Sequence, residues 1–496
     1  MAHCKCGASL TKRKFLDSCK NGYGPVSCLS AEIPYTSPER LYPLFSGSGS
    51  FVFESVKGPE KIARYSFIGF DPYLSMRAKE KKIAVRSGTS QSISYAHPLK
   101  LLGELLEGYA QKPVDGLPPF QGGAAGLLSY DFSRYLERLP DTTIDDLQIP
   151  DAHFFFIDRL ISFDHKTRKA WAIVCPGVRR KACVDAGLWY EEAESVLDEI
   201  CRRIESTAWE DASHTIHPVR RGIEIIHGMK KKEYMDMVIR AKEYIAAGDI
   251  FQANLSHRIS AHLGEASPWE LYRILSAMNP SPFAGFADFG EYWIVSSSPE
   301  RLVKVKDGTV ETRPIAGTRP RGKDMREDEL MRAELLLNEK ERAEHIMLID
   351  LERNDLGRVS MYGSVEVDEL MITEDYSHVM HIVSNVRGKL MHRKTCLDVI
   401  RAVFPGGTIT GVPKVRCMEI IDELEPVRRG PYTGSLGYLG FSGVMDMNII
   451  IRSFVVKNGH AYVQAGAGIV ADSDPEREYH ETIKKAEALI ASLGRC

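Results

Sequence analysis

The C-terminal half of the chain is organised around residues 311–322, whose sequence is ETRPIAGTRPRG. Pro314 cannot donate to a sheet ladder, and Gly317 permits a positive φ or a close backbone approach, so a strand should stop here. Arg319 and Arg321 follow, and their guanidinium groups suit a carboxylate ligand. The stretch therefore predicts a strand end followed by a basic loop. The alternative is an ordinary surface turn with solvated arginines.

Length and composition limit the classes of protein to which this chain can belong. A length of 496 residues predicts two domains or one large elaborated domain. The 64 basic and 67 acidic side chains leave a formal net charge of −3, which favours neither nucleic acid nor a membrane surface as a partner. No apolar run is long enough to span a bilayer, and no signal core is present at the N-terminus. We therefore expect a cytoplasmic protein.

The spacing of the 10 cysteines does not match a disulfide framework, and this predicts reduced thiols. The opening HCKC at residues 3–6, followed by Cys19 and Cys28, lacks the paired C-x-x-C knuckles of a zinc site. A loose N-terminal tail is the preferred interpretation of this segment.

The first half alternates short apolar runs with turn residues, as in SFVFES at residues 50–55 and ARYSFIG at residues 63–69. This pattern predicts a mainly antiparallel sheet. Further strands are expected at residues 154–161 and 169–174, helices at 101–109 and 186–207, and a glycine-rich loop at 118–126.

A polar, aperiodic segment between about residues 206 and 222 predicts a boundary between two halves. The predicted division is an N-terminal tail (1–25), an N-terminal domain (26–205), a linker (206–228) and a second domain (229–496).

The second half begins with a predicted helix at residues 232–248, after which a strand carries Gln252. A strand at residues 292–300 ends in a proline, which leaves Glu300 at its terminus. Residues 303–310 continue as a hairpin-like pair, and residues 326–351 predict one long charged helix.

Two helices carry carboxylates three residues apart, which places each pair on one helix face. The pairs are Glu341 with Glu344 and Glu478 with Glu481. Oxygen ligands of this kind suit Mg²⁺, with waters and a ligand carboxylate completing the coordination. The alternative for each pair is a solvated helix face.

Two glycine-rich stretches, expected to be loops, border these helices: FPGGTITGVPK at residues 404–414 and QAGAGIV at residues 464–470. Their backbone amides could approach an anion closely. The first lacks the spacing of a phosphate loop, so no nucleotide is predicted. Tyr432 lies between them, and Arg452 is expected to end an apolar strand as a carboxylate clamp or as a simple cap of the sheet.

Five ordered stretches resemble the chorismate-utilising family of enzymes. They are RPIAGTR at 313–319, RNDLGR at 353–358, YSHVMH at 376–381, GVPKVR at 411–416 and QAGAG at 464–468. The first half resembles that of the same family's synthase subunits through FES at 53–55 and RYSFIG at 64–69. The resemblance implies an α+β fold like that of the anthranilate synthase large subunit, with antiparallel sheets as a sandwich-like core and surrounding helices.

The resemblance also implies roles for individual residues. Glu341, Glu344, Glu478 and Glu481 match the Mg²⁺-binding carboxylates of the family, with the metal holding the ring carboxylate of chorismate. Glu300 matches the general acid that protonates the departing 4-hydroxyl, and His381 matches a residue beside the ring. The positions that match substrate contacts are Gly317, Thr318, Thr408, Tyr432, Arg452, Gly466, Ala467, Gly468 and Lys485.

Two positions bear on the nucleophile. Family members that add water carry a lysine where this chain has Gln252, so the resemblance implies ammonia instead. Ala316 stands where many aminodeoxychorismate synthases have a nucleophilic lysine, and this favours anthranilate as the product. Residues 279–284 lack the Tyr-Met pair typical of the tryptophan-regulated anthranilate enzymes, and residues 404–411 and 428–435 more closely resemble aminodeoxychorismate synthase. Aminodeoxychorismate synthase is the preferred prediction; anthranilate synthesis is the alternative.

Either reaction needs ammonia, and the chain shows no glutaminase pattern, so a glutamine amidotransferase subunit is the expected partner. Glu54 and Ser55 match a tryptophan-binding motif of the family. The alternative to an enzyme is a non-catalytic module that binds chorismate or tryptophan.

Overall fold

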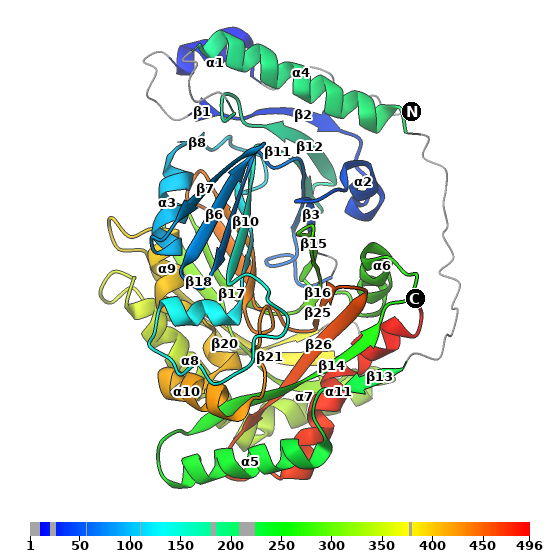
Figure 1. Ribbon diagram of the computed structural model, residues 1–496, viewed down its shortest axis with the longest axis vertical. Coiled ribbons are helices and arrows are strands. Elements are labelled where there is room, and N and C mark those ends of the chain that lie inside the picture. The colour runs from blue at the N-terminus through cyan, green and yellow to red at the C-terminus, as the bar shows by residue number, and fades with distance from the viewer. Residues whose placement is uncertain are drawn as a thin grey trace.

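The computed structural model describes residues 10–19, 26–55, 57–109, 111–179, 185–207, 224–375 and 379–496. Within these residues, two 12-stranded antiparallel sheets form the body of the protein, and β1 pairs with β8 in a small parallel ladder. Figure 1 shows the helices on the outside of the sheets. The expected α+β class, with antiparallel sheets in a sandwich-like core, is confirmed.

Sheet I contains the predicted carboxylate-binding stretch at one edge. Its strands, in spatial order, are β19 (Ile315–Pro320), β21 (Val379–Lys389), β18 (Thr309–Arg313), β17 (Arg301–Lys306), β24 (Met445–Asn448), β23 (Ser435–Gly440), β9 (Gly123–Leu128), β10 (Ala152–Ile157), β5 (Leu74–Lys79), β6 (Lys82–Ser87) and β7 (Ser90–Ser94), with β20 (Glu366–Asp375) paired to β21.

Sheet II carries the strands that hold Gln252 and the second glycine-rich stretch. Its order is β13 (Ile225–His227), β14 (Gln252–His262), β26 (His460–Ile469), β25 (Ser453–Lys457), β16 (Trp293–Ser298), β15 (Phe283–Asp288), β3 (Phe51–Glu54), β4 (Tyr65–Gly69), β11 (Arg159–Asp164), β12 (Lys169–Val174) and β2 (Leu29–Ile33), with β22 (Gly411–Val412) paired to β14. The separate ladder is β1 (Val26–Ser27) with β8 (Gln111–Lys112).

The helices cover the outer faces of these sheets. They are α1 (Lys12–Ser18), α2 (Pro38–Phe45), α3 (Pro98–Glu107), α4 (Ala186–Glu205), α5 (Lys231–Ala246), α6 (Pro268–Met278), α7 (Met325–Leu337), α8 (Glu339–Gly357), α9 (Cys396–Val403), α10 (Lys414–Leu424) and α11 (Pro475–Leu493), with 3-10 turns η1 (Tyr130–Tyr135) and η2 (Gly407–Ile409).

The two sheets pack on each other through aromatic side chains. Phe67 on β4 lies with its ring centroid 5.3 Å from that of Tyr438 on β23 and 5.7 Å from that of Phe120. Edge-to-face contacts of this kind stabilise a core by about 0.5–1.5 kcal/mol beyond the area they bury. This interior fixes the separation of the sheets and hence the positions of the loops at their ends.

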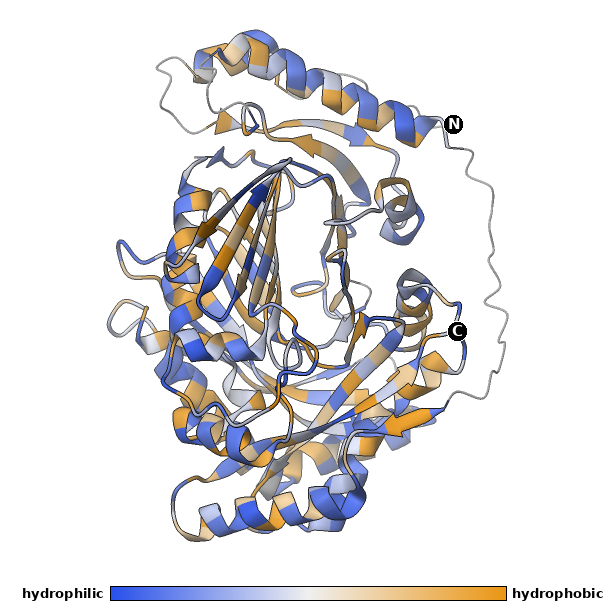
Figure 2. Ribbon diagram, in the orientation of Figure 1, coloured by the Kyte–Doolittle hydropathy of each residue, from blue (hydrophilic) through white to orange (hydrophobic). Residues whose placement is uncertain are grey.

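Helix α4 shows why the sequence folds as it does locally. Asp185 caps it by accepting hydrogen bonds from the N–H groups of Gly187 and Leu188. Its buried residues recur every three or four positions along one stripe. Figure 2 shows the resulting alternation of hydrophilic and hydrophobic positions along this helix and along α11.

Both predicted halves contribute to both sheets. Strand β9 lies between β10 and β23 in sheet I, and β3 pairs with β15 in sheet II. The predicted tail includes α1, where Phe15 lies 5.6 Å from the ring of Tyr190 on α4. Residues 208–223 of the predicted linker lie outside the described residues. The division of the chain into domains stays a prediction.

The predicted strand end is confirmed, because β18 ends at Arg313, but the predicted basic loop after it is wrong. Residues 315–320 form β19, which pairs with β21 at the edge of sheet I. The register shifts between Ala316 and Thr318, so a bulge at Gly317 absorbs one extra residue without ending the strand. Arg319 and Arg321 do not lie in a ligand-facing loop: they bind Glu334 and Asp328 of α7.

Three other elements differ from expectation. Residues 464–470, predicted as a loop, fall largely within β26, because glycine there permits close approach to β14. The long helix divides at Asn338, which ends α7 and caps α8 by accepting the Glu341 N–H at 3.0 Å. Arg452 does not end a strand; it lies between β24 and β25 with φ of 50°.

Two smaller predictions need correction, whereas the prediction of reduced thiols agrees with the described cysteines. Residues 154–161 form parts of two strands, β10 and β11, separated at Asp158. Strand β9 begins inside the predicted loop at residues 118–126, at Gly123. The described cysteines are free thiols, while Cys4 and Cys6 lie outside the described residues.

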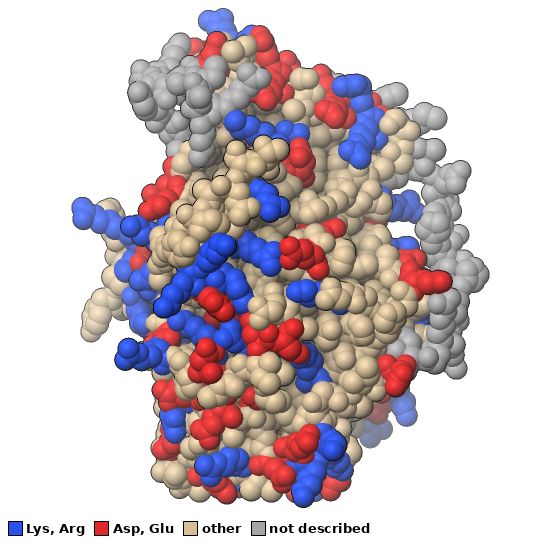
Figure 3. All heavy atoms as spheres, in the orientation of Figure 1, with Lys and Arg blue, Asp and Glu red and all other residues tan. Residues whose placement is uncertain are grey.

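The surface shows no dominance of one charge. Figure 3 shows Lys and Arg interspersed with Asp and Glu over the viewed face, in keeping with the formal net charge of −3. In the part of the chain that the structure describes, no helix combines the length and the apolar character needed to cross a bilayer.

Candidate active site

Glu300 follows β16 and precedes β17, which places it where the two sheets meet. Its side chain is buried, and this burial raises the pKa of the carboxyl to about 8. The Thr408 side chain and the Arg452 charge oppose the shift, whereas the Glu352 charge adds to it. Glu300 therefore carries a proton near neutral pH and is suited to donate it.

Gly317 brings β19 into contact with α8. Its φ is 60°, and a Cβ placed there would lie 2.4 Å from Oε2 of Glu341 and 2.9 Å from the Leu335 side chain. Glycine is therefore required both by the backbone conformation and by the lack of room for a side chain. The bulge positions the backbone of Gly317 beside a predicted metal ligand.

His381 lies on β21 opposite Thr318 of β19. Its Nδ1 is 2.9 Å from Thr318 Oγ1 and 3.3 Å from the carbonyl oxygen of Gly317. Burial, assisted by the positive charge of Arg452, lowers the pKa of His381 to about 3. The imidazole is therefore neutral and joined to the bulge that carries Gly317.

The glycines of β26 face β14. Successive residues of a strand point to opposite faces, so Gly466 and Gly468 share one face and Ala467 takes the other. A Cβ at Gly466 would lie 2.6 Å from Oδ1 of Asn254, and one at Gly468 would lie 2.4 Å from Nε2 of Gln252. Ala467 is buried in the core, so only its backbone could contact a ligand.

Each of the predicted metal-binding helices lies next to this pair of strands. Gln252 donates from Nε2 to Oε1 of Glu344 at 2.7 Å. On α11, Lys485 donates to the Gly466 carbonyl at 3.1 Å and pairs with Glu481 at 2.8 Å. The carboxylates of α8 and α11 therefore lie near the same segment of β26.

The remaining predicted ligands have their own surroundings. Arg319 donates from Nη1 to Oε1 of Glu341 at 2.7 Å. Glu478 is half-buried in the first turn of α11, and its charge and that of Glu481 act on the buried Tyr234.

Three buried side-chain oxygens on the elements of this region have no hydrogen-bond partner among the described residues. They are Oε1 of Gln252, Oδ1 of Asn254 and Oε2 of Glu341. Buried polar atoms are normally paired, so a polar ligand or an ion would account for them. An all-oxygen set of this kind fits Mg²⁺ in donor chemistry. No group of three or more His, Cys, Asp or Glu side chains lies close enough to hold a metal in the described part of the chain.

Arg429 organises the loop that presents Tyr432. It pairs with Glu425 inside the protein, and its guanidinium donates to the carbonyls of Ile409 and Asn254 at 3.0 and 2.6 Å. Its guanidinium carbon lies 5.7 Å from the centroid of the Tyr432 ring. One buried cation thus ties together the segments that carry Thr408, Asn254 and Tyr432.

A separate cavity of about 270 Å³ contains Glu54 and Ser55. Glu54 accepts a hydrogen bond from the Tyr272 hydroxyl at 2.5 Å, and burial raises its pKa to about 7. The Ser55 hydroxyl lies 2.9 Å from the carbonyl of Tyr65 and 3.2 Å from that of Pro282. We call this region the Glu54 cavity.

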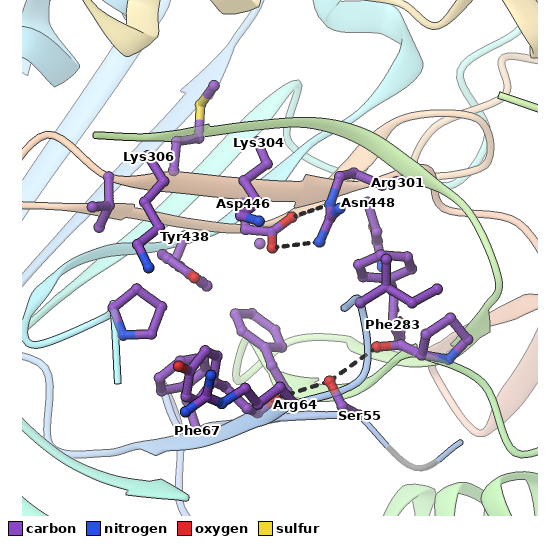
Figure 4. A pocket seen from close by; sticks show the side chains of 18 of the residues that line it. Ser55, Arg64, Phe67, Phe283, Arg301, Lys304, Lys306, Tyr438, Asp446 and Asn448 are labelled. Atoms are coloured by element: carbon purple, nitrogen blue, oxygen red, sulfur yellow. Dashed lines mark hydrogen bonds and ion pairs between the residues drawn. The ribbon is translucent and has the colours of Figure 1, made fainter. Parts of the chain in front are cut away.

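Charged side chains of both signs line the Glu54 cavity. Figure 4 shows Arg301, Lys304, Lys306 and Asp446 along one wall and Ser55, Arg64 and Phe67 along the other. Arg301 binds Asp446 through two hydrogen bonds of 2.9 and 3.1 Å. The structure thus keeps the predicted tryptophan-binding residues apart from Glu300, Gln252 and the glycines of β26.

Sequence reasoning did not identify two buried residues that support the site, Arg429 and Glu352. Arg429 lies in residues 428–435, a stretch used only to compare family members. Glu352 immediately precedes the RNDLGR stretch at residues 353–358. Their role depends on burial and on partners distant in sequence, so no local signal could have revealed it.

Comparisons with known proteins identify the family of the chain. Residues 49–491 match the family described as chorismate binding enzyme. Anthranilate synthase component 1 of Acetivibrio thermocellus is 43% identical over 463 residues, covering 92% of each chain. Aminodeoxychorismate synthase component 1 of Bacillus subtilis (strain 168) is 43% identical over 442 residues, covering 89% of this chain and 91% of the relative.

Solved structures show the same fold. Anthranilate synthase component I from Streptococcus pneumoniae TIGR4 superposes with a TM-score of 0.77 at 35% identity, covering 92% of this chain and 97% of that one. The menaquinone-specific isochorismate synthase MenF from Escherichia coli shares the fold with a TM-score of 0.69 at 16% identity, covering 94% of each chain. With its site geometry, its family match and these relatives taken together, the chain is an enzyme and belongs to the chorismate binding enzyme family.

Proposed function

We propose that this chain aminates chorismate with ammonia. The observation that carries the proposal is Glu300, a buried acid that keeps its proton near neutral pH beside Thr408 and Arg452. On β14, Gln252 offers no base for activating water, because a carboxamide is not basic; its Nε2 donates to Glu344. An acid without a partner base suits a nucleophile that is already reactive, as ammonia is.

The reaction requires the 4-hydroxyl of chorismate to leave as ammonia adds. Glu300 would donate its proton to that oxygen, so that the broken C–O bond releases water and the new C–N bond forms without a charged leaving group. Ala316 lies on the bulged strand β19 and provides no nucleophile. The amination would therefore proceed by direct attack of ammonia, without a covalent enzyme adduct.

Substrate carboxylates would be held by residues at the edges of the two sheets. Arg452 and Lys485 supply positive charge, and the backbone at Gly317, Gly466 and Gly468 leaves room for close approach. His381, neutral and bound to Thr318, would orient the ring without competing for the proton.

Mg²⁺ is the proposed cofactor. Glu341, Glu344, Glu478 and Glu481 would hold it, and when bound it would neutralise the ring carboxylate of the substrate. The unpartnered Oε2 of Glu341 supports this assignment.

We propose 4-amino-4-deoxychorismate as the product, with anthranilate and pyruvate as the second candidate. The first rests on residues 404–411 and 428–435, which resemble aminodeoxychorismate synthase, and on residues 279–284, which lack the Tyr-Met pair typical of tryptophan-regulated anthranilate enzymes. Ala316 favours the second. Relatives of both kinds are 43% identical to this chain.

Ammonia would come from a glutamine amidotransferase that binds this chain, since the relatives are named as first components. The experiment is to incubate the isolated chain with chorismate, Mg²⁺ and ammonium at mildly alkaline pH. Fluorescent anthranilate formed directly would establish the second product; an aromatic product that needs added aminodeoxychorismate lyase would establish the first. No consumption of chorismate would refute the amination.

For the Glu54 cavity we propose tryptophan as the ligand. Glu54 and Asp446 could receive its ammonium group, while Arg64 and Lys304 offer charge for its carboxylate. A rise in thermal stability on adding tryptophan, lost in Ser55→Ala, would support this assignment. An unchanged melting temperature at millimolar tryptophan would oppose it.

A further inference from the structure

Three consecutive serines, Ser296, Ser297 and Ser298, end strand β16. All three are fully buried, with 0% of their surface exposed. A buried hydroxyl is costly unless it is hydrogen-bonded, so each of the three needs a partner. Successive side chains of a strand point to opposite faces, so Ser296 and Ser298 share one face and Ser297 takes the other.

The chain crosses between the two sheets twice near this run of serines. Residues 299 and 300 connect β16 of sheet II to β17 of sheet I, and residues 449–452 connect β24 of sheet I to β25 of sheet II. The first crossover carries Glu300, and the second ends in Arg452. The proposed acid and the proposed carboxylate ligand therefore lie on separate crossovers, which must be held together if both residues are to contact one substrate.

Ser298 joins the two crossovers through a closed ring of hydrogen bonds. The Ile449 N–H donates directly to the Glu300 carbonyl at 3.0 Å. The Ser298 hydroxyl supplies the return path: it accepts from the Glu300 N–H at 3.3 Å and donates to the Ile449 carbonyl at 2.6 Å. Its contact with the Glu300 carbonyl is longer, at 3.5 Å. The backbone of Glu300 is thus fixed to Ile449 on both sides.

Ser296 holds the end of the second crossover. It pairs with Ser453 in the register of β16 with β25, and the two hydroxyl oxygens are 2.7 Å apart. Ser453 directly follows Arg452, whose carbonyl accepts the backbone N–H of Ser297 at 3.2 Å. Arg452 is therefore flanked by a hydroxyl pair and by a backbone hydrogen bond to the same strand.

The hydroxyl of Ser297 faces a different segment. Its Oγ accepts from Nδ2 of Asn279 at 3.2 Å and lies 3.1 Å from Oγ of Ser281. Among the described residues, this hydroxyl has its hydrogen bonds to that segment and not to either crossover. Ser297 thus matches its two neighbours in burial and chemistry and differs from them in partners.

We propose that Ser298 is a positioning residue for Glu300 and that Ser296 is a positioning residue for Arg452. The ring through Ser298 sets where the acid meets the departing oxygen, and the pair of Ser296 with Ser453 sets where the guanidinium meets a substrate carboxylate. The inference rests on the proposed function, in which Glu300 donates a proton and Arg452 binds the substrate. Because a displaced acid weakens the transition state and a displaced ligand weakens substrate binding, the two serines should control different kinetic constants.

Single alanine substitutions of the three serines test this division. Ser298→Ala should lower kcat by about 10- to 100-fold, the loss expected for a misplaced catalytic group, and should change KM for chorismate by less than about threefold. Ser296→Ala should raise KM by about three- to tenfold, the worth of one hydrogen bond, and should leave kcat nearly unchanged. Ser297→Ala is the matched control, because it removes an equally buried hydroxyl and keeps the backbone N–H, and it should change neither constant.

Three results would overturn the proposal: an unchanged kcat in Ser298→Ala, an unchanged KM in Ser296→Ala, or equal changes in all three variants. If Ser298→Ala does not fold, Ser298→Cys takes its place, since a thiol is similar in shape and a weaker donor. Ser298→Cys should also lower kcat more than it changes KM, and a full kcat in this variant would count against the ring.

Hydrogen exchange keeps the test independent of turnover. Ser298→Ala removes the acceptor of the Glu300 N–H, so the Glu300 and Ile449 amides should exchange faster than in the wild type, whereas Ser297→Ala should leave both rates in place. Mass spectrometry of peptides that cover these two residues measures the rates. A wild-type chain that does not consume chorismate, together with this faster exchange, would refute the amination and keep the ring. An active wild-type chain with unchanged exchange in Ser298→Ala would refute the ring and keep the amination.

Discussion

Glu300, which is buried, and Glu54, which is partly exposed, are carboxyls at the ends of strands in or beside sheet II, yet their surroundings differ. Glu54 accepts a hydrogen bond from a neutral donor, the Tyr272 hydroxyl. Glu300 faces Thr408, Arg452 and a second acid, Glu352. The same burial raises the pKa to about 7 in one case and to about 8 in the other.

The difference shows what separates a binding pocket from a reaction site in one fold. Around the Glu54 cavity the charged walls are paired with each other, as Arg301 is with Asp446. Near Gln252 and Glu341, by contrast, buried oxygens lack partners among the described residues. Unsatisfied polar atoms beside a protonated acid point to chemistry, whereas a satisfied cavity points to recognition.

Among the predicted variants, Glu300→Gln should reduce turnover most, and it should separate the two regions most clearly. Removing the proton donor is expected to reduce kcat by about 10²- to 10⁴-fold, because general acid catalysis contributes that much. The same change at Glu54 should reduce turnover by less than about tenfold, since Glu54 lies outside the proposed reaction site. Steady-state kinetics with chorismate and ammonium measure both, and equal losses would erase the distinction between the two regions.

The second-largest effect is expected for Glu344→Gln, which should raise the Mg²⁺ concentration that turnover requires. Loss of one carboxylate is expected to raise the Mg²⁺ concentration for half-maximal turnover by at least the ~10- to 100-fold typical of changes around a metal site. Glu339→Gln, exposed at the start of the same helix, is the control for the charge change. Magnesium titrations that coincide for wild type and Glu344→Gln would remove Glu344 from the proposed metal set.

Gly317→Ala separates backbone strain from crowding at the bulge. Its φ of 60° should cost about 1–2 kcal/mol, and contact with Glu341 should lower activity as well. Gly308→Ala is matched, because Gly308 has a φ of 70° with no atom within 4 Å of the added Cβ. Urea unfolding measures the stability cost of each variant, and turnover measures its loss of activity. Comparable activity losses would mean that the bulge has no special contact with α8.

Glu300 and Glu54 should contribute differently to the pH dependence of the free energy of unfolding. Glu300 has an ordinary pKa of 4.5 and a folded pKa of about 8, so below pH 4.5 both states are protonated. As the pH rises from 4.5 to about 8 the unfolded state releases its proton first, and the free energy of unfolding falls.

Glu300→Gln should remove that fall, whereas Glu54→Gln should remove only the part between pH 4.5 and about 7. Urea unfolding at a series of pH values measures both slopes. Parallel curves for wild type and Glu300→Gln would show that Glu300 is not buried as described.

Local patterns predicted many elements of the fold but not the edge of sheet I. Helix 186–207 and strand 169–174 follow from periodicity and match α4 and β12 closely. The prediction failed at residues 315–320 and 464–470, where glycine was taken as a sign of a loop. In both places glycine serves close packing between neighbouring elements, which local sequence does not reveal.

The sequence by itself determined the family, the acidic pairs on two helices and the residues offered as acid and ligands. It could do so because motif order and helical spacing are properties of the chain alone. Only the tertiary structure decided that Glu300 is buried, which raises its pKa to about 8, and that Gln252 is bound to Glu344. Burial and pairing depend on which distant strands meet, and these determine the charge of each group.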